Sequence, residues 1–350
     1  MRKVITNLSI AFIASIIPIG VLVYGYTVRM KEITYDFERK IITPAKDVKM
    51  KNIKYNSYYF AGQLGERIYL GNYTASRHVL EVSTSLADTQ SKTISVDKMY
   101  FKPKGNYNLY VDNNRFYMLN GLERSILSGD NNSWVARKDK IFVPYFTQSI
   151  PLSNSSVVYR INSAKTGYNS LRKESLLGRI DNETALKKQI DGVFCTDGKL
   201  EYNKHLGIFT YMYYYRNQVL LLDTNLNVIG KIKTIDPIDT AKFQVSKINA
   251  NKASTFSSTR LLVNARCSTW NNYLFIQSKL IGKHEDENSF KTSIVIDVYD
   301  IPRSIYLYSF YLPDLNFDPI RQFKVMDGCI ITLSGNFIVK YTIKLPPMRS

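Results

Sequence analysis

Residue types that commonly do chemistry are sparse in this sequence. It contains three histidines, His78, His205 and His284, which leaves few candidates for acid–base catalysis or metal binding by histidine. His78 begins a strand-like run and His205 precedes another, so we expect both to be partly exposed residues at strand ends. Neither a GxSxG nucleophile motif nor a phosphate-binding P-loop occurs. The sequence therefore identifies no catalytic residues, and it predicts no cofactor and no metal site.

Two acidic segments have the residue types of a divalent-cation site. His284 to Glu287 falls in a turn between two strand-like runs, where charged side chains are usually just solvated. Asp223 to Asn227 is similar to the start of a calcium-binding loop. Such a loop needs a glycine at its sixth position and a bidentate glutamate at its twelfth, and Val228 and Thr234 stand there. We predict polar turns in both places.

The cysteines give no pattern typical of a metal site. Cys195, Cys267 and Cys329 are odd in number and far apart, so at least one has no disulfide partner within the chain. Each lies beside apolar residues in a strand-like run, which favours small buried thiols. A disulfide between Cys195 and Cys267 is the alternative.

The chain is strongly basic, with 47 Lys and Arg against 29 Asp and Glu and a formal net charge of +18. Such a charge attracts phosphates, anionic lipids and acidic glycans. The basic residues are scattered, and neither a run of five of them nor a nucleic-acid motif occurs. A solvated basic surface is therefore expected, and nucleic acid is not an expected partner.

The N-terminus predicts entry into a membrane. Val4 to Val28 carries no charge and is flanked by basic residues on both sides, which is long enough for a transmembrane helix. A signal peptide usually has a shorter apolar core and ends in a small-x-small site. The best cleavage site here follows Gly25, with Val23 at the third-last position, and it fits poorly. We predict an uncleaved single-pass anchor in the inner membrane with the domain in the periplasm; a periplasmic or secreted form after cleavage is the alternative.

Strand-like hairpins dominate the rest of the chain. Leu206 to Asp236 is typical of three antiparallel strands joined by short polar turns. Its aromatic run, Thr210 to Tyr215, could form a ligand platform, but alternation would bury half of the side chains, so core packing is favoured. Hairpins of the same kind occur at Arg67 to Val82, Tyr107 to Leu119, Ser149 to Ile161, Gly207 to Leu222, Asn272 to Val298 and Gly328 to Ile343.

The spacing of these hairpins predicts an all-β, six-bladed β-propeller. We explain two longer intervals by insertions: Lys165 to Ile190, expected to carry a short surface helix, and Asp236 to Arg260, expected to be a polar loop. The last unit lacks room for a fourth strand, so Lys51 to Tyr59 is predicted to close the ring. The expected division is a membrane segment at residues 1–30, a linker at 31–50, the propeller at 51–344 and a tail at 345–350.

The repeat pattern from Lys51 to Ile343 resembles bacterial exported six-bladed propellers of the TolB-like and NHL-like kind. Segments such as NQVLLLDTNLNVIGKIKTID, Asn217 to Asp236, are similar to the blade strands of those proteins. The resemblance implies a propeller fold and an extracytoplasmic location. It identifies no functional residues.

Three functions are compatible with this organisation. The first is a membrane-anchored binding module of the cell envelope whose loops contact a protein or carbohydrate partner. The second is an enzyme acting on glycans, a hydrolase or lyase, with two carboxylates facing each other in the central funnel. The third is a purely structural envelope component. The scarcity of catalytic residue types favours binding over catalysis, and the oligomeric state stays open.

Overall fold

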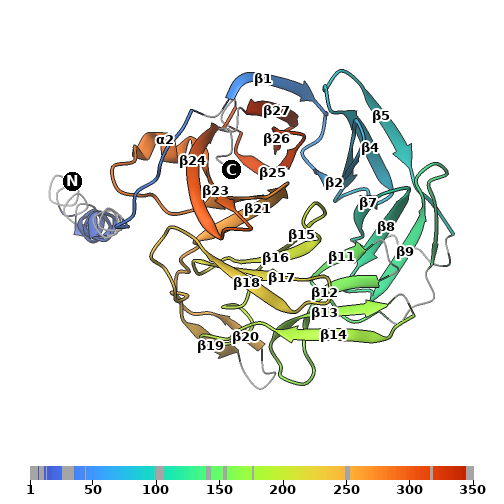
Figure 1. Cartoon of the computed structure of the whole chain (residues 1–350). Coiled ribbons are helices and arrows are strands. Elements are labelled where there is room, and N and C mark those ends of the chain that lie inside the picture. Colours follow the sequence, from blue (N-terminus) through green and yellow to red (C-terminus); the bar gives the residue numbers. More distant parts are fainter. Residues whose placement is uncertain are drawn as a thin grey trace.

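The protein is a closed ring of six antiparallel sheets arranged around a central axis, as the computed structural model shows (Figure 1). The structure describes residues 7, 12, 14–25, 35–43, 45–97, 99, 106–138, 143–152, 156–175, 177–248, 253–315 and 318–343. The six-bladed propeller predicted from the hairpin repeats is therefore confirmed.

Each blade is a meander in which the first strand lies nearest the axis. Blade 1 consists of β2 (Tyr58–Leu64), β3 (Arg67–Asn72), β4 (His78–Ser83) and β5 (Thr89–Thr93). Blade 2 consists of β7 (Asn108–Asp112), β8 (Arg115–Asn120), β9 (Ser125–Asp130) and β10 (Val135–Lys138), with β6 (Ser95–Val96) parallel to β10 at its outer edge. Blade 3 consists of β11 (Gln148–Leu152), β12 (Ser156–Asn162), β13 (Asn169–Ser175) and β14 (Ile180–Ala185).

The other three blades follow the same order, with one interruption. Blade 4 consists of β15 (Gly198–Asn203), β16 (Ile208–Tyr213), β17 (Gln218–Leu222) and β18 (Val228–Lys233). A separate hairpin, β19 (Val245–Ile248) and β20 (Ala253–Phe256), precedes blade 5, which consists of β21 (Asn264–Trp270), β22 (Tyr273–Ser278), β23 (Ser293–Asp300) and β24 (Ile305–Pro313). A short helix, α2 (Glu287–Lys291), connects β22 to β23.

The ring closes in blade 6, where chain ends meet. β25 (Ile320–Met326), β26 (Cys329–Ser334) and β27 (Phe337–Ile343) are completed by β1 (Ala45–Asn52), which runs antiparallel to β27 with Val48 opposite Tyr341. The predicted closure from the N-terminal side is right in kind, but the strand begins earlier than Lys51 to Tyr59. β1 is the outermost strand of its blade and buries little; Val48, for example, is 50% exposed. Its sequence therefore lacks the alternation of buried and exposed residues from which a strand is predicted.

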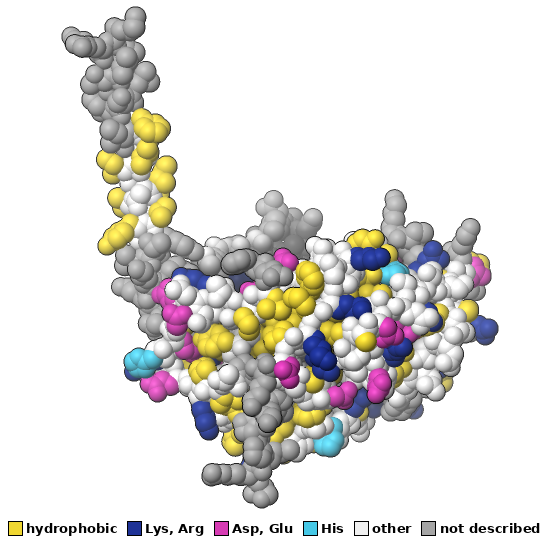
Figure 2. All heavy atoms as spheres, turned by 90° about the horizontal axis from the view of Figure 1, so that it is seen from above, with side chains coloured by type: hydrophobic (Ala, Val, Ile, Leu, Met, Phe, Trp, Pro, Cys, Tyr) yellow, Lys and Arg dark blue, Asp and Glu magenta, His cyan; other side chains and the backbone are white. Residues whose placement is uncertain are grey.

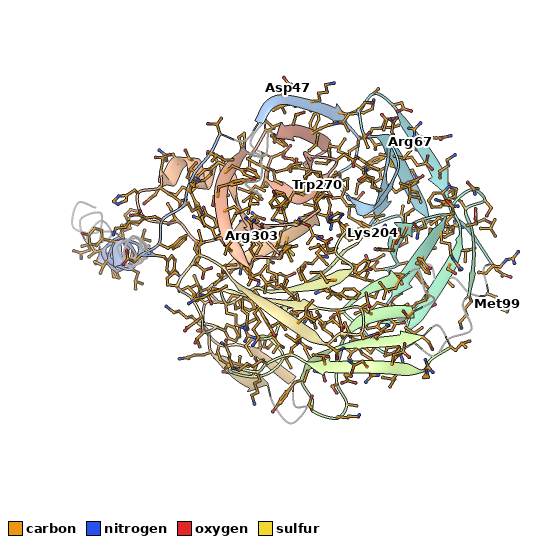
Figure 3. All side chains as sticks on the ribbon, in the orientation of Figure 1. Asp47, Arg67, Met99, Lys204, Trp270 and Arg303 are labelled. Atoms are coloured by element: carbon orange, nitrogen blue, oxygen red, sulfur yellow. The ribbon has the colours of Figure 1, made fainter. Side chains whose placement is uncertain are left out.

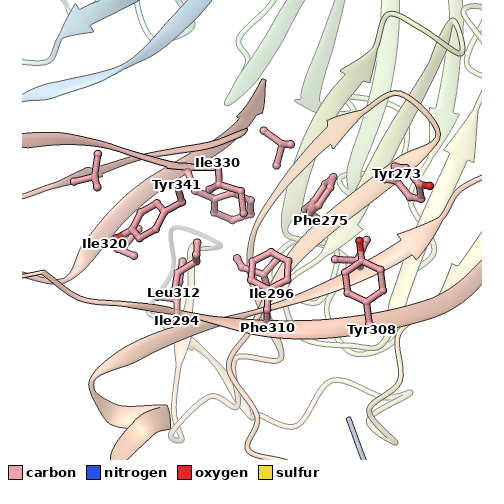
Figure 4. Packing of buried hydrophobic residues seen from close by; sticks show 14 residues of the cluster. Tyr273, Phe275, Ile294, Ile296, Tyr308, Phe310, Leu312, Ile320, Ile330 and Tyr341 are labelled. Carbon is pink, nitrogen blue, oxygen red and sulfur yellow. The ribbon is translucent and has the colours of Figure 1, made fainter. Parts of the chain in front are cut away.

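A hydrophobic core fills every junction between neighbouring blades. Between blades 5 and 6, Phe275 and Phe310 meet Ile330 and Tyr341, all nearly inaccessible to solvent (Figure 4). Equivalent clusters join the other five pairs of neighbours. Because each blade buries both faces against its neighbours, the ring holds the inner strands at fixed positions around the axis.

The segment predicted to carry a helix, Lys165 to Ile190, instead forms β13 and β14, the outer half of blade 3. Its polar residues pair across the two strands: Arg172 Nε donates to Glu183 Oε2 at 2.9 Å, and Ser170 Oγ donates to Glu183 Oε1 at 2.8 Å. Because these polar residues pair across the outer strands, the segment has the polar composition that is also typical of a surface helix. The interval between the predicted hairpins of blades 3 and 4 is long because the two hairpins are not equivalent. Ser149 to Ile161 contains the first and second strands of blade 3, whereas Gly207 to Leu222 contains the second and third strands of blade 4.

Residues 35–43, within the predicted linker, pack against blade 5. The Arg39 guanidinium is fully buried and bonds to Asp297 Oδ1 at 2.7 Å and to Glu285 Oε1 at 2.5 Å. Ile42 N donates to Ser309 O at 2.9 Å, so the segment also pairs with β24. Residues 35–43 of the expected linker therefore pack on the propeller.

Much of the predicted membrane span, Val4 to Val28, lies outside the described residues. Residues 14–25 are helical and exposed, and they stand at the rim of the ring with their axis roughly along the ring axis (Figures 1 and 2). Within the described residues, no helix has the length and apolar character needed to cross a membrane.

Candidate binding pocket

The inner strands of all six blades surround a central cavity of about 830 Å³. Most of its lining residues come from β2, β7, β11, β15, β21 and β25 and from the segments next to them. Tyr73 and Tyr214, which follow the second strands β3 and β16, also reach the cavity. Figure 3 shows Trp270 and Lys204, which come at the ends of β21 and β15, near the centre of the ring. The inner strands of a propeller run in the same direction along the axis, so residues near their beginnings gather at one end of this pocket.

Three basic residues lie near the beginnings of three inner strands. Lys199 is the second residue of β15, Arg321 the second of β25 and Arg266 the third of β21. The ladders shift register at the starts of β21 and β25, between Asn264 and Arg266 and around Arg321. Register shifts of this kind are β-bulges, which change the direction in which side chains point. Here they occur where Arg266 and Arg321 reach the pocket.

Neutral groups hold both arginines. Arg266 Nη1 donates to Gln277 Oε1 at 2.5 Å, while Arg321 Nη2 and Nη1 donate to the carbonyls of Gly335 at 2.9 Å and Tyr58 at 3.3 Å. Within the described part of the chain, none of these three acceptors is a carboxylate. The two guanidinium groups are therefore fixed in place while their charge stays available.

The pKa values reflect this concentration of charge. Burial lowers the pKa of the Arg266 guanidinium; Tyr214 opposes the shift and Arg321 adds to it. Burial also lowers the pKa of Arg321, with Tyr73 and Asp318 acting in the opposite sense. The pKa of Lys279, just beyond β22, falls through burial and the nearby Arg266. The positive forms of all three side chains are thus destabilised in this unliganded pocket.

Deeper in the pocket, one carboxylate is paired with lysines. Glu201 accepts a short hydrogen bond from Lys324 Nζ, and its other oxygen lies 3.6 Å from Lys199 Nζ. Burial alone would raise the Glu201 pKa, but Lys324 and Lys199 outweigh it and hold that pKa below its usual value. Of the described lining residues, the cations are Lys199, Lys204, Arg266, Arg321 and Lys324, and the only carboxylate is Glu201.

Aromatic rings border the same end of the pocket. Tyr73, which is 51% exposed, packs on Tyr59 with ring centroids 4.4 Å apart, and Gln322 Nε2 donates to its hydroxyl at 3.1 Å. Burial raises the pKa of Tyr214 to about 12, so its phenol is neutral at physiological pH. The rings supply flat, half-exposed surfaces beside the cations.

The three histidines are dispersed in the structure. His205 lines the pocket in the turn after β15. His78 is bonded to Tyr58 Oη at 2.8 Å on blade 1, and burial lowers its pKa. His284 lies on the outside of blade 5, 3.8 Å from Glu38. Both outer positions agree with the expected partly exposed strand ends and turns.

The two acidic segments have structural roles. Asp286 accepts from Ser289 N at 2.7 Å and caps α2, while Glu285 accepts from Arg39. Asp223 Oδ1 accepts from the amides of Asn225 and Asn227, both at 2.8 Å, which confirms the predicted turn.

The thiols and the aromatic run mostly belong to the core. Cys195, Cys267 and Cys329 are free, so the alternative disulfide is wrong: the first two are buried in different clusters, and Cys329 is half-buried. Within Thr210 to Tyr215, every residue is buried except Tyr214, which reaches the pocket. The core interpretation therefore holds for all but that residue.

Sequence reasoning missed the cations of the pocket. Lys199, Arg266 and Arg321 are far apart in the chain, and nothing local distinguishes them from other basic residues. Their shared feature is a place near the start of an inner strand, which becomes visible once the first strand of each blade is assigned.

The fold and the pocket define a six-bladed β-propeller with a basic central cavity. No family model and no curated protein matches the sequence. Among solved structures, a member of the DUF4221 family from Bacteroides vulgatus is similar, with a TM-score of 0.58, 9% identity, and coverage of 89% of this chain and 99% of that chain. A protein from Bacteroides fragilis described as exported gives a TM-score of 0.54, 9% identity, and coverage of 89% and 99%. These likenesses show the fold.

Proposed function

We propose that this protein is a non-enzymatic binding module of the cell envelope that receives its ligand in the central pocket. The observation that carries the proposal is the convergence of polar, charged and aromatic side chains from all six inner strands on one cavity of about 830 Å³. That volume lies within the range of roughly 300–1,000 Å³ typical of ligand sites. A small molecule, a carbohydrate end or a short segment of a protein partner fits it.

The arrangement of carboxylates favours binding over glycan cleavage. A hydrolase of the usual kind needs two carboxyl groups about 5–10 Å apart, one of them free to give or take a proton. The described lining supplies Glu201, whose charge is neutralised by Lys324 and Lys199. The enzyme alternative therefore lacks support from the geometry of the pocket.

The proposal places the propeller outside the cytoplasm, held at the membrane by residues 1–30. It is supported by the uncharged stretch from Val4 to Val28 and by the likeness to a protein described as exported. N-terminal sequencing of the protein purified from its native membrane tests the anchor. A sequence that begins at Met1 agrees with it, and one that begins near Tyr26 shows cleavage and a released form.

Blocking the pocket tests the binding function. Asn108, an exposed residue at the start of β7, lines the cavity, so Asn108→Trp fills it without disturbing the core. Asn114→Trp, in the exposed turn after β7, is the matched control. Recovery of the partner from envelope extracts by the intact protein should fall for Asn108→Trp alone, with unchanged Tm. Equal recovery by both variants would contradict binding in the pocket.

A second contact surface is proposed at the β19–β20 hairpin, which lies outside the six blades. Its Phe256 packs with Phe243 and Tyr215 at ring-centroid distances of 5.1 and 6.1 Å, so the hairpin has a fixed base. The other predicted insertion, Lys165 to Ile190, forms the outer half of blade 3. Replacing residues 245–255 by a short Gly-Ser linker should leave the ring folded; unchanged recovery of the partner would then remove this surface from the account.

A further inference from the structure

The basic end of the pocket has a defined geometry. Lys199, Arg266 and Arg321 lie near the beginnings of β15, β21 and β25, the inner strands of three neighbouring blades. Tyr73 lies at the same end, because Gln322, the residue after Arg321, donates to its hydroxyl at 3.1 Å. Tyr214 lies there too, because it follows Tyr213, which pairs with Gly198, the residue before Lys199. These five side chains therefore surround a single space at one end of the cavity.

We propose that this space is an oxyanion site, in which a carboxylate, sulfate or phosphate group of a small organic ligand lies between Lys199, Arg266 and Arg321. The inference rests on the proposed binding function and names the chemical class of the ligand. A guanidinium group presents a planar fork of donors that matches the oxygens of such an anion. Two forks and one ammonium group give the donors for a three-oxygen or two-oxygen group.

The three cations around this space have bonding partners that leave their positive charge available to an anionic ligand. Both guanidinium groups bond to neutral acceptors, as described above. Lys199 Nζ forms a longer ion pair with Glu201, at 3.6 Å, and its side chain is 42% exposed. Lys324 makes the direct bond to Glu201 instead. An incoming anion therefore meets two guanidinium groups held by neutral acceptors and one ammonium group whose ion pair with Glu201 is long. It also relieves the mutual repulsion of the two arginines.

The tyrosines restrict what accompanies the anion. Tyr73 presents half of its surface beside Arg321 and is held by Gln322 and Tyr59, so its ring is a rigid flat wall. A ligand with a flat or apolar face next to its acidic group contacts both features at once. An acidic sugar has this form, whereas inorganic phosphate offers the anion alone.

Calorimetric titration of the intact chain in detergent at low salt tests the site with three probes. The probes are sodium glucuronate, uncharged glucose and inorganic phosphate. We expect glucuronate to bind, phosphate to bind more weakly, and glucose not to bind at comparable concentrations. Binding of glucuronate should weaken as salt is added, because the attraction is electrostatic.

Variants connect the binding to the named residues. Arg266→Gln and Arg321→Gln should each weaken glucuronate binding by about tenfold or more, as expected for loss of a charge-assisted hydrogen bond. Arg266→Lys keeps the charge without the fork and should fall between wild type and Arg266→Gln. Lys233→Gln removes one exposed charge from the outer strand of blade 4 and should leave binding unchanged. Tm is measured for every variant, so that loss of fold is separated from loss of binding.

The outcomes separate this inference from the function on which it rests. If wild type binds neither anion at millimolar concentration, or if the arginine variants bind as wild type does, the oxyanion site is wrong. If glucose binds as well as glucuronate and Asn108→Trp abolishes both, the pocket binds ligands without an oxyanion site. If Asn108→Trp changes neither probe binding nor recovery of the envelope partner, the proposed function itself fails.

Discussion

At the scale of single residues, the binding chemistry of the pocket depends on which of its positive side chains are paired with a carboxylate. Glu201 and Lys324 form a pair that neutralises the deep part of the pocket, whereas Arg266 and Arg321 are held by neutral oxygens. The same number of charged groups, six, arranged as three ion pairs would give an inert channel. The difference between paired and unpaired cations therefore defines the candidate site.

Replacing Lys324 with glutamine tests the role of that pair. Lys324 and Lys199 hold the Glu201 pKa below its ordinary value of 4.5, so the pair stabilises the fold above about pH 4.5 and loses its effect as pH falls through the lower folded pKa. At pH 7 we expect Lys324→Gln to lower the free energy of unfolding by about 1–3 kcal/mol. Urea unfolding measures it.

The pH dependence is the control for that experiment. Below the folded pKa of Glu201 the carboxylate is protonated in both states, so the difference between wild type and Lys324→Gln should shrink. A difference that stays constant from pH 7 down to pH 3 would show that Lys324 contributes through packing and not through its charge.

At the scale of elements, the segment before β1 is part of the propeller. Residues 35–43 lie on blade 5, Phe37 is buried beside Val263 and Leu280, and Arg39 is enclosed by two carboxylates. A docked segment of this kind connects any anchor at residues 1–30 to two blades, since it contacts blade 5 and continues as the outer strand of blade 6.

Arg39→Met should be strongly destabilising. Asp297 is 2% exposed, and without the guanidinium it is left as a buried carboxylate, which costs about 3–5 kcal/mol. Arg67→Met is the matched control, because Arg67 pairs with Asp88 at 2.8 Å on the surface, where side-chain exposures are 39% and 56%. Solvent screens that exposed pair, so its loss should change stability little. Equal losses in chemical unfolding would show that the Arg39 cluster has no special weight.

Truncation tests the closing strand. A chain that begins at residue 44 keeps β1, and a chain that begins at Ile53 lacks it. The shorter chain leaves the edge of β27 unpaired, and we expect its Tm to be lower by roughly 10 °C or more, from about 1 kcal/mol per lost hydrogen bond and 2–4 °C per kcal/mol. Thermal unfolding of the two truncations compares them directly. If their transitions coincide, β1 does not stabilise the ring.

Sequence patterns predicted the blades because their middle strands are buried on both faces. QVLLL in β17 and SIVIDV in β23 are apolar runs with turn residues beside them, so all six hairpins were found in the right places. The outer strands could not be predicted in the same way, because β1 and β14 are largely polar or exposed and carry no apolar alternation. One was taken for a linker and the other for a helix.

At the scale of the whole molecule, the net charge of +18 is distributed in two ways. On the face shown in Figure 2, basic and acidic side chains are interspersed, as the scattered sequence positions predicted. In the central cavity the described lining is strongly one-sided. The ring produces this imbalance, because residues that are remote in sequence come together only when six inner strands share one axis.

The central claim is that the basic end of this cavity holds an anion. The most direct measurement is a crystal of the protein soaked in sodium selenate, whose selenium gives anomalous diffraction and whose oxygens resemble those of sulfate. We expect an anomalous peak within hydrogen-bond distance of Arg266 and Arg321, with Lys199 Nζ beside it. Peaks confined to the outer surface, with none in the pocket at full soak, would contradict it.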